Sequence, residues 1–216
     1  MPSLYNRVAG QSVDRIAALS DGIFAVAMTL LVLDLRVPAA EAVHSEHDLR
    51  HVLIPLAPRL LIYFMSIMTN GIFWVGQQTQ LNYFARSDRN LAWIHIAFLG
   101  LISLTPFTTS LLAEFIHYRT ALLIYWSNIL LLGLTLYWSW SYATRAHLLA
   151  DDLPPEVHPA VIRRILIAQT LYAAGAALCF LSTYYAIAAI ILIQLNYAIA
   201  PTFCWGIFSR KSAEQS

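Results

Sequence analysis

The chain has 216 residues, of which 59% are hydrophobic and 12% are charged, and its mean hydropathy is +0.62. This composition predicts a polytopic membrane protein in contact with lipid. The formal net charge of +1, without a basic patch interleaved with aromatic residues, gives no reason to expect a nucleic-acid partner.

Six apolar segments follow one another, each close to or above the roughly 20 residues that span a bilayer. They run over Arg15–Leu35, Leu53–Gln77, Leu91–Phe115, Ala121–Tyr142, Ile162–Thr183 and Tyr185–Phe208. The last two are nearly continuous and require a tight turn; a five-span alternative would put the C-terminus on the opposite side. We expect an all-α fold with six transmembrane helices over residues 15–208, a cytoplasmic segment at 1–14 and a cytoplasmic tail at 209–216.

The linker Val37–Val52 is the longest outer loop, and it interleaves acidic residues with His44, His47 and His51. Such alternation suggests metal binding, but this spacing without cysteine is a weak metal signal. We expect a solvated loop or a short amphipathic helix there, and no metal site. The inner linker Ala150–Pro159 is rich in proline and acidic residues and separates the fourth and fifth segments.

The distribution of basic residues predicts the orientation through the positive-inside rule. With the N-terminus inside, the inner segments hold Arg7, Arg15, Arg86, Arg89, Arg145, Arg163, Arg164, Arg210 and Lys211. The outer segments hold Arg36, Arg50, Arg59 and Arg119. This asymmetry predicts a multi-pass protein of the cell membrane with both termini in the cytoplasm.

The first segment places Arg15, Ser20 and Asp21 inside apolar sequence. A charge in hydrocarbon costs a few kcal/mol or more, so such residues usually have a structural or functional role. On a helical wheel, small residues and a Val–Thr–Leu set form one stripe. The stripe comprises Ala18, Gly22, Ala25, Val26, Thr29 and Leu33, with Leu30 on its flank. It is either an ordinary helix-packing seam or the lining of a pore, and the wheel alone leaves both open.

The motif Arg15-x-x-x-Leu19-Ser20-Asp21-Gly22, with the apolar run that ends at Leu33, resembles the prokaryotic members of the lysosomal potassium channel family, the transmembrane protein 175 family. That family carries an Arg-x-x-x-Phe-Ser-Asp signature at the start of its first helix. The likeness continues through Tyr63–Gln78 and Trp93–Leu112. Here Leu19 replaces the signature Phe, Gln77 stands where the family usually has His, and His95 where it usually has Asn.

The resemblance implies a potassium-preferring channel without the TVGYG loop of ordinary potassium channels, and the sequence contains no such loop. One signature per chain implies a homotetramer in which four first helices line a central pore. Carried over by position, Val26 is the narrow hydrophobic ring, Leu30 and Leu33 are the further rings, and Thr29 is a ring of hydroxyls. The permeant ion would be K⁺, with no cofactor.

We expect Arg15, Ser20 and Asp21 to serve the architecture by bonding to neighbouring helices, with Gln77 and His95 as candidate partners. Arg15 and Asp21 lie six residues apart, which excludes a simple i, i+4 pair.

Two rival functions and a purely structural membrane subunit remain alternatives. A secondary transporter of a small cation or metabolite would use Asp21 and His95 as proton carriers, and it predicts broken helices and inverted repeats. An intramembrane enzyme would need Ser20 with His95 or His117, but no GxSxG or HExxH motif supports it, so we expect no enzymatic activity.

Overall fold

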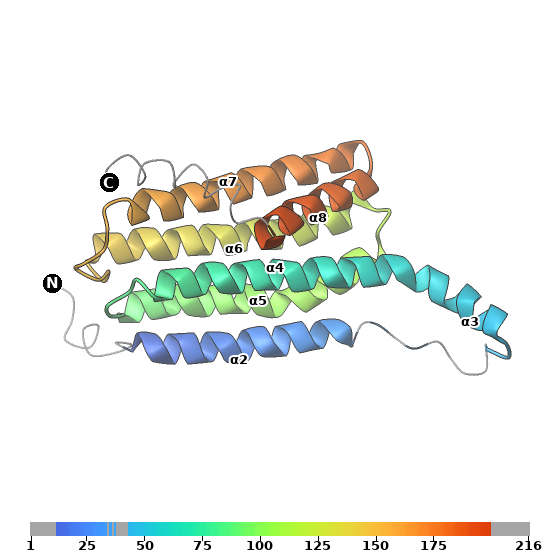
Figure 1. Cartoon of the computed structure of the whole chain (residues 1–216), viewed down its shortest axis with the longest axis horizontal. Helices are drawn as coiled ribbons and strands as arrows, with labels where there is room; N and C mark the ends of the chain where they lie inside the picture. Colours follow the sequence, from blue (N-terminus) through green and yellow to red (C-terminus); the bar gives the residue numbers. More distant parts are fainter. Residues whose placement is uncertain (1–11, 34, 36, 38–42, 200–216) are drawn as a thin grey trace, which may run out of the picture.

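The computed structural model describes residues 12–33, 35, 37 and 43–199, and its long elements are all helices (Figure 1). These are α2 (Val13–Val32), α4 (Ala57–Leu81), α5 (Arg89–Glu114), α6 (Arg119–Arg145), α7 (Val157–Ala177) and α8 (Thr183–Ile199). Shorter elements are α3 (Glu46–Leu53) and the 3₁₀ helices η2 (Ile54–Leu56) and η3 (Leu178–Phe180). Successive long helices run in opposite directions, as connections that cross a membrane require.

Five helical stretches are long and apolar enough to span a bilayer, which confirms the first five predicted segments. They are Val13–Val32, Glu46–Leu81, Arg89–Glu114, Arg119–Arg145 and Val157–Phe180. The sixth, α8, is apolar but is described over 17 residues only. The remainder of its predicted segment, and most of the predicted terminal segments, lie outside the described residues, so the six-span count stays a prediction.

Local sequence explains where the helices begin. The side chain of Ser12 accepts a hydrogen bond from the backbone N–H of Arg15 at the start of α2, and that of Asp88 does the same at the start of α5. The helix α7 begins five residues before the predicted Ile162. Pro159 falls in its first turn, where the missing N–H would have no partner in the helix anyway.

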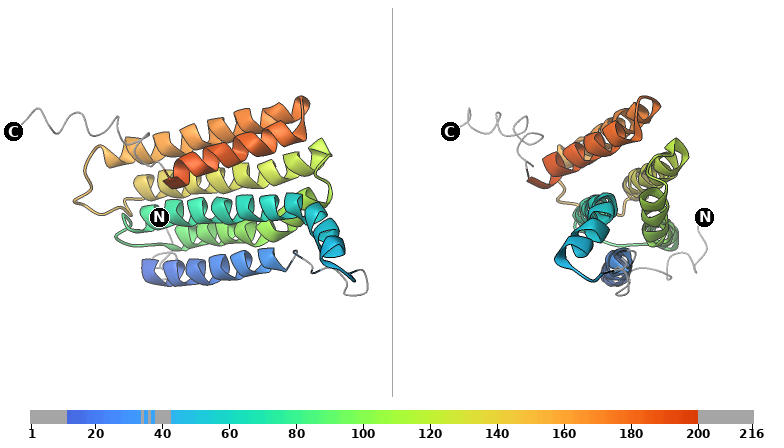
Figure 2. Two further views of the ribbon diagram at one scale, coloured as in Figure 1. Left: turned by 45° about the vertical axis from the view of Figure 1, so that its right-hand side comes forward. Right: turned by 90° about the vertical axis from the view of Figure 1, so that its right-hand side faces the viewer.

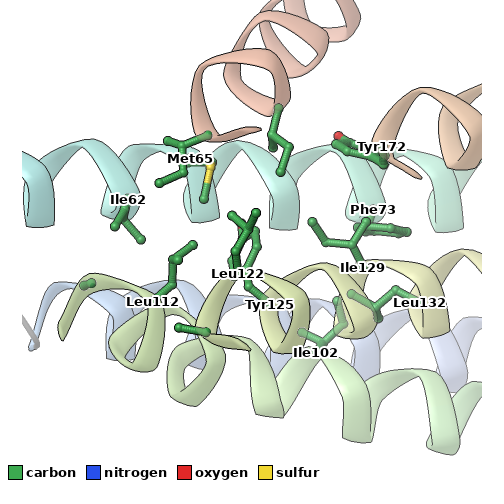
Figure 3. Close-up of a cluster of buried hydrophobic side chains, with 14 of the residues drawn as sticks. Ile62, Met65, Phe73, Ile102, Leu112, Leu122, Tyr125, Ile129, Leu132 and Tyr172 are labelled. Atoms are coloured by element: carbon green, nitrogen blue, oxygen red, sulfur yellow. The ribbon is translucent and has the colours of Figure 1, made fainter. Parts of the chain in front are cut away.

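The helix α2 lies at one edge of the bundle and packs on α4 and α5. The hairpin of α7 and α8 lies on the other side, as the two views of Figure 2 show. Between them lies the apolar core, which is formed mainly by side chains of α4, α5 and α6, with Tyr172 contributed by α7 (Figure 3). Its labelled members are Ile62, Met65, Phe73, Ile102, Leu112, Leu122, Tyr125, Ile129, Leu132 and Tyr172.

One face of α2 is buried against this core. Its buried residues, Ser20, Phe24, Ala27 and Leu31, recur at the spacing of one helical face. The ring of Phe24 lies 6.1 Å from that of Phe98 on α5 in a tilted arrangement. This contact fixes the rotation of α2 about its own axis, and therefore decides which residues face away from the bundle.

Candidate pore face and its polar support

The residues predicted to line a pore lie on the side of α2 that faces away from the bundle. Val26 is 54% exposed, Leu30 44% and Leu33 70%. Thr29 is exposed as well, and a Cβ added at Gly22 would meet nothing within 4 Å. The chain therefore leaves the predicted stripe uncovered by its other described helices.

The hydroxyl of Thr29 is oriented by its own helix. Thr29 Oγ1 donates to the backbone oxygen of Val26 at 2.8 Å. Because its proton is engaged there, the hydroxyl oxygen keeps its lone pairs for other partners. On an exposed face, such an oxygen can accept from water or approach a cation.

Behind this face, a chain of hydrogen bonds crosses four helices. Ser20 Oγ donates to the backbone oxygen of Ile16 at 2.7 Å and accepts from Gln77 Nε2 on α4 at 2.9 Å. Gln77 Nε2 also lies 3.1 Å from His95 Nδ1 on α5, and His95 Nε2 lies 3.2 Å from Ser139 Oγ on α6. An amide nitrogen only donates, so His95 Nδ1 accepts and the ring proton belongs on Nε2. Ser20, Gln77 and His95 thus meet in one buried network.

Asp21 has partners other than the expected Gln77 and His95. Its Oδ1 accepts from Trp74 Nε1 at 2.8 Å and from Gln78 Nε2 at 2.9 Å. The reason is angular: Asp21 lies about 100° around the helix from Ser20, at the exposed edge of the contact with α4. Trp74 and Gln78 are one turn apart there and converge on one carboxylate oxygen.

Arg15 stands apart from both sets of contacts. Its side chain is exposed at the beginning of α2, and its backbone N–H donates to Ser12. Its side chain makes no hydrogen bond or ion pair with any described residue. An exposed guanidinium at a helix end is typical of a side chain that reaches towards the membrane surface.

The sequence did not predict a second buried cluster, which consists of hydrogen-bonded polar side chains from four helices. Tyr125 OH on α6 lies 2.9 Å from Thr69 Oγ1 and 3.3 Å from Ser66 Oγ, both on α4. Gln194 Nε2 on α8 donates to Thr69 Oγ1 at 2.6 Å, and Thr109 Oγ1 on α5 donates to Ser66 Oγ at 2.8 Å. Ser66 and Thr69 belong to one segment, and Thr109, Tyr125 and Gln194 to three others, so no spacing within a single segment reveals the cluster.

The geometry favours neither an intramembrane enzyme nor a secondary transporter. The hydroxyl proton of Ser20 goes to a backbone oxygen, so no base activates it as a nucleophile. The helix α5 continues without a break through Pro106, unlike the discontinuous helices that a transporter site requires. Across the described part of the chain, no group of three or more His, Cys, Asp or Glu residues could hold a metal.

Comparison with known proteins finds relatives that are named ion channels. The family described as "Endosomal/lysosomal potassium channel TMEM175" matches residues 15–106. A potassium channel of Streptomyces collinus is 30% identical over 188 residues, covering 85% of this chain and 90% of the relative. The human endosomal/lysosomal proton channel TMEM175 is 24% identical over 205 residues, and the match covers 39% of its length.

One solved structure shares the arrangement of helices. The crystal structure of a lysosomal potassium-selective channel TMEM175 homolog from Chamaesiphon minutus superposes with a TM-score of 0.75 at 27% identity. The match covers 87% of this chain and 96% of that one.

Proposed function

The chain belongs to the TMEM175 family of membrane ion channels, and from this premise we propose that four copies form a potassium-preferring cation channel. The α2 helices of the four subunits line its central pore. The relative from Streptomyces collinus is named a potassium channel, which supports K⁺ as the permeant ion.

The observation that carries the proposal is the uncovered face of α2. Large apolar side chains suffice for a helix face that meets only lipid. This face instead combines Gly22, Ala25 and Thr29 with the larger Val26 and Leu33, all exposed. Small residues allow helices to approach closely in a membrane, so the composition suits neighbouring α2 helices around an axis.

The conduction path follows from the helical rise of about 1.5 Å per residue, which puts Val26 and Leu33 about 10 Å apart along the axis. Rings of Val26, Leu30 and Leu33 then form a short hydrophobic neck that closes by excluding water. No TVGYG-type loop takes part. The Thr29 ring supplies the hydroxyl oxygens within the neck, and partly dehydrated K⁺ passes there more readily than Na⁺.

The proposed topology places the protein in the cell membrane with six spans and both termini inside. Most of the basic residues described lie at the end where α2 begins. That end has Arg15, Arg86, Arg89, Arg145, Arg163 and Arg164, and the opposite end has Arg50, Arg59 and Arg119. The α8 helix completes the sixth span and returns the chain to the inner side.

Recording from the purified chain in planar bilayers tests the proposal. We expect unitary currents and a reversal potential that favours K⁺ and Cs⁺ modestly over Na⁺. Native mass spectrometry from detergent is expected to show four chains per particle. A proton gradient at constant K⁺ serves as the control for proton conduction. Stoichiometric flux without unitary currents, or currents carried by protons alone, would contradict the proposal.

A further inference from the structure

Two histidines of α3 stand one helical turn apart with their ring nitrogens facing each other. His47 Nε2 and His51 Nε2 lie 3.2 Å apart, the ring centroids are 4.4 Å apart, and both side chains are exposed. We propose that this pair chelates a divalent transition-metal ion of the zinc class on the loop between α2 and α4. The sequence pattern alone is a weak metal signal, and the short distance between the two ring nitrogens is the observation that strengthens it.

The separation of the two nitrogens suits a shared metal. Two nitrogens bound to one Zn²⁺ at about 2.0–2.1 Å lie about 2.9–3.4 Å apart for bond angles between about 90° and 110°. The observed 3.2 Å falls inside this interval. The distance between the two nitrogens therefore already matches that of two ligands of one ion.

Without a metal, these two nitrogens make only a weak contact. One neutral ring can donate its Nε2–H to the other, and a hydrogen bond between neutral groups contributes about 1 kcal/mol or less in water. A metal ion takes the place of this shared proton and uses both lone pairs. The pair is thus arranged in advance for a metal ion that binds two imidazole ligands.

The surrounding helix keeps the pair in register. Ser45 Oγ caps α3 by accepting from the backbone N–H of Asp48 at 3.1 Å, and α3 continues through η2 into α4. Two histidines at i and i+4 are the spacing of helical zinc ligands in HExxH sites. Here the residue after His47 is Asp48, whose carboxylate accepts from the backbone N–H of His44 at 3.2 Å. The pair therefore serves binding, and no base stands ready for hydrolysis.

The chemistry of the donors selects the ion. Imidazole suits Zn²⁺, Ni²⁺ and Cu²⁺, whereas Ca²⁺ and Mg²⁺ prefer oxygen ligands. Since no described third His, Cys, Asp or Glu joins the pair, water fills the remaining coordination positions. A metal that links positions 47 and 51 also ties one turn of α3 together, so binding should stabilise this helix.

Calorimetry with Zn²⁺ on the full chain tests the site. The full chain is purified in detergent with any polyhistidine tag removed, and Ca²⁺ is titrated in parallel. We expect one Zn²⁺ per chain and no saturable heat with Ca²⁺. In His47→Ala and His51→Ala, Zn²⁺ affinity should fall at least about tenfold. Removing a residue that only supports a metal ligand already lowers affinity about 10- to 100-fold, and these variants remove a ligand itself. The matched control His44→Ala keeps the wild-type affinity, because its ring is outside the pair.

Hydrogen exchange gives a second readout that does not depend on heats. Zn²⁺ should slow amide exchange over Glu46–Leu53 in the wild type and in His44→Ala, and leave His51→Ala unchanged. Three results would overturn the site: no saturable Zn²⁺ binding, wild-type binding in both pair variants, or an equal loss in His44→Ala. None of these measurements involves ion conduction, so their outcome is independent of the proposed channel function.

Discussion

Gln77 on α4 donates a hydrogen bond to Ser20 on α2, with 2.9 Å between Nε2 and Oγ. Neither side chain is accessible to solvent, and the same amide nitrogen reaches His95 on α5. The helix that carries the candidate pore face is therefore joined to the bundle by one amide that bonds two other helices. A change at this amide or its partners should act on packing before it acts on ion passage.

Substituting Ser20 by Ala should destabilise the folded chain. The change leaves one N–H of Gln77 buried without an acceptor, which costs about 1–3 kcal/mol. The matched control is Ser103→Ala, because Ser103 Oγ also donates to a backbone oxygen four residues earlier but lies on an exposed face. Thermal unfolding in detergent should show a lower midpoint for Ser20→Ala only. Equal midpoints for the two variants would remove Ser20 from the support of α2.

Asp21 should matter for assembly more than for ion preference. Asp21→Ala leaves Trp74 Nε1 and Gln78 Nε2 without their shared acceptor and loosens α2 from α4. We expect a smaller fraction of tetramer on size-exclusion chromatography, with an unchanged reversal potential in the channels that remain. Trp74→Phe removes one of the two bonds and should show a weaker form of the same defect. A fully assembled Asp21→Ala tetramer with altered K⁺ over Na⁺ preference would contradict this assignment.

Shortening the rings of the neck should increase conduction. Val26→Ala and Leu33→Ala widen the proposed constriction and lower the barrier to wetting, so K⁺ flux into liposomes should rise several-fold. Leu134→Ala is the matched control, because Leu134 is similarly exposed but lies on α6. Flux that is unchanged in both α2 variants, or equally raised in the control, would remove these residues from the pore.

Hydropathy was enough to predict five spans, because a membrane helix needs a long apolar run whatever its neighbours are. The wheel also grouped the residues of the exposed face of α2 into one stripe, although it left open whether that stripe packs on other helices or lines a pore. Ser20, Phe24 and Leu31 fall on the opposite face, and packing on α4 and α5 buries that face. These features depend on helical period and composition, which are properties of a single segment.

The partners of the buried polar groups depend on more than one segment. Asp21 bonds Trp74 and Gln78 because of the relative height and rotation of α2 and α4, which no single segment contains. The contact of Tyr125 with Thr69 is of the same kind. The facing rings of His47 and His51 depend on side-chain rotamers, so the sequence pattern predicted a solvated loop or a short amphipathic helix there but not the ring geometry.

Thr29 offers the sharpest test of ion preference. Its hydroxyl proton is held by the backbone oxygen of Val26, so in the proposed pore its oxygen lone pairs are the polar groups nearest the passing ion within the neck. Thr29→Val keeps the shape and removes the oxygen, and the K⁺ over Na⁺ permeability ratio should fall towards one. Thr29→Ser keeps the oxygen and should retain most of the preference. Bi-ionic reversal potentials measure both, with Thr135→Val on α6 as a control for a threonine that also bonds its own helix. If Thr29→Val retains the wild-type ratio, the hydroxyl ring is not the source of selectivity, and the preference must come from the width of the hydrophobic neck.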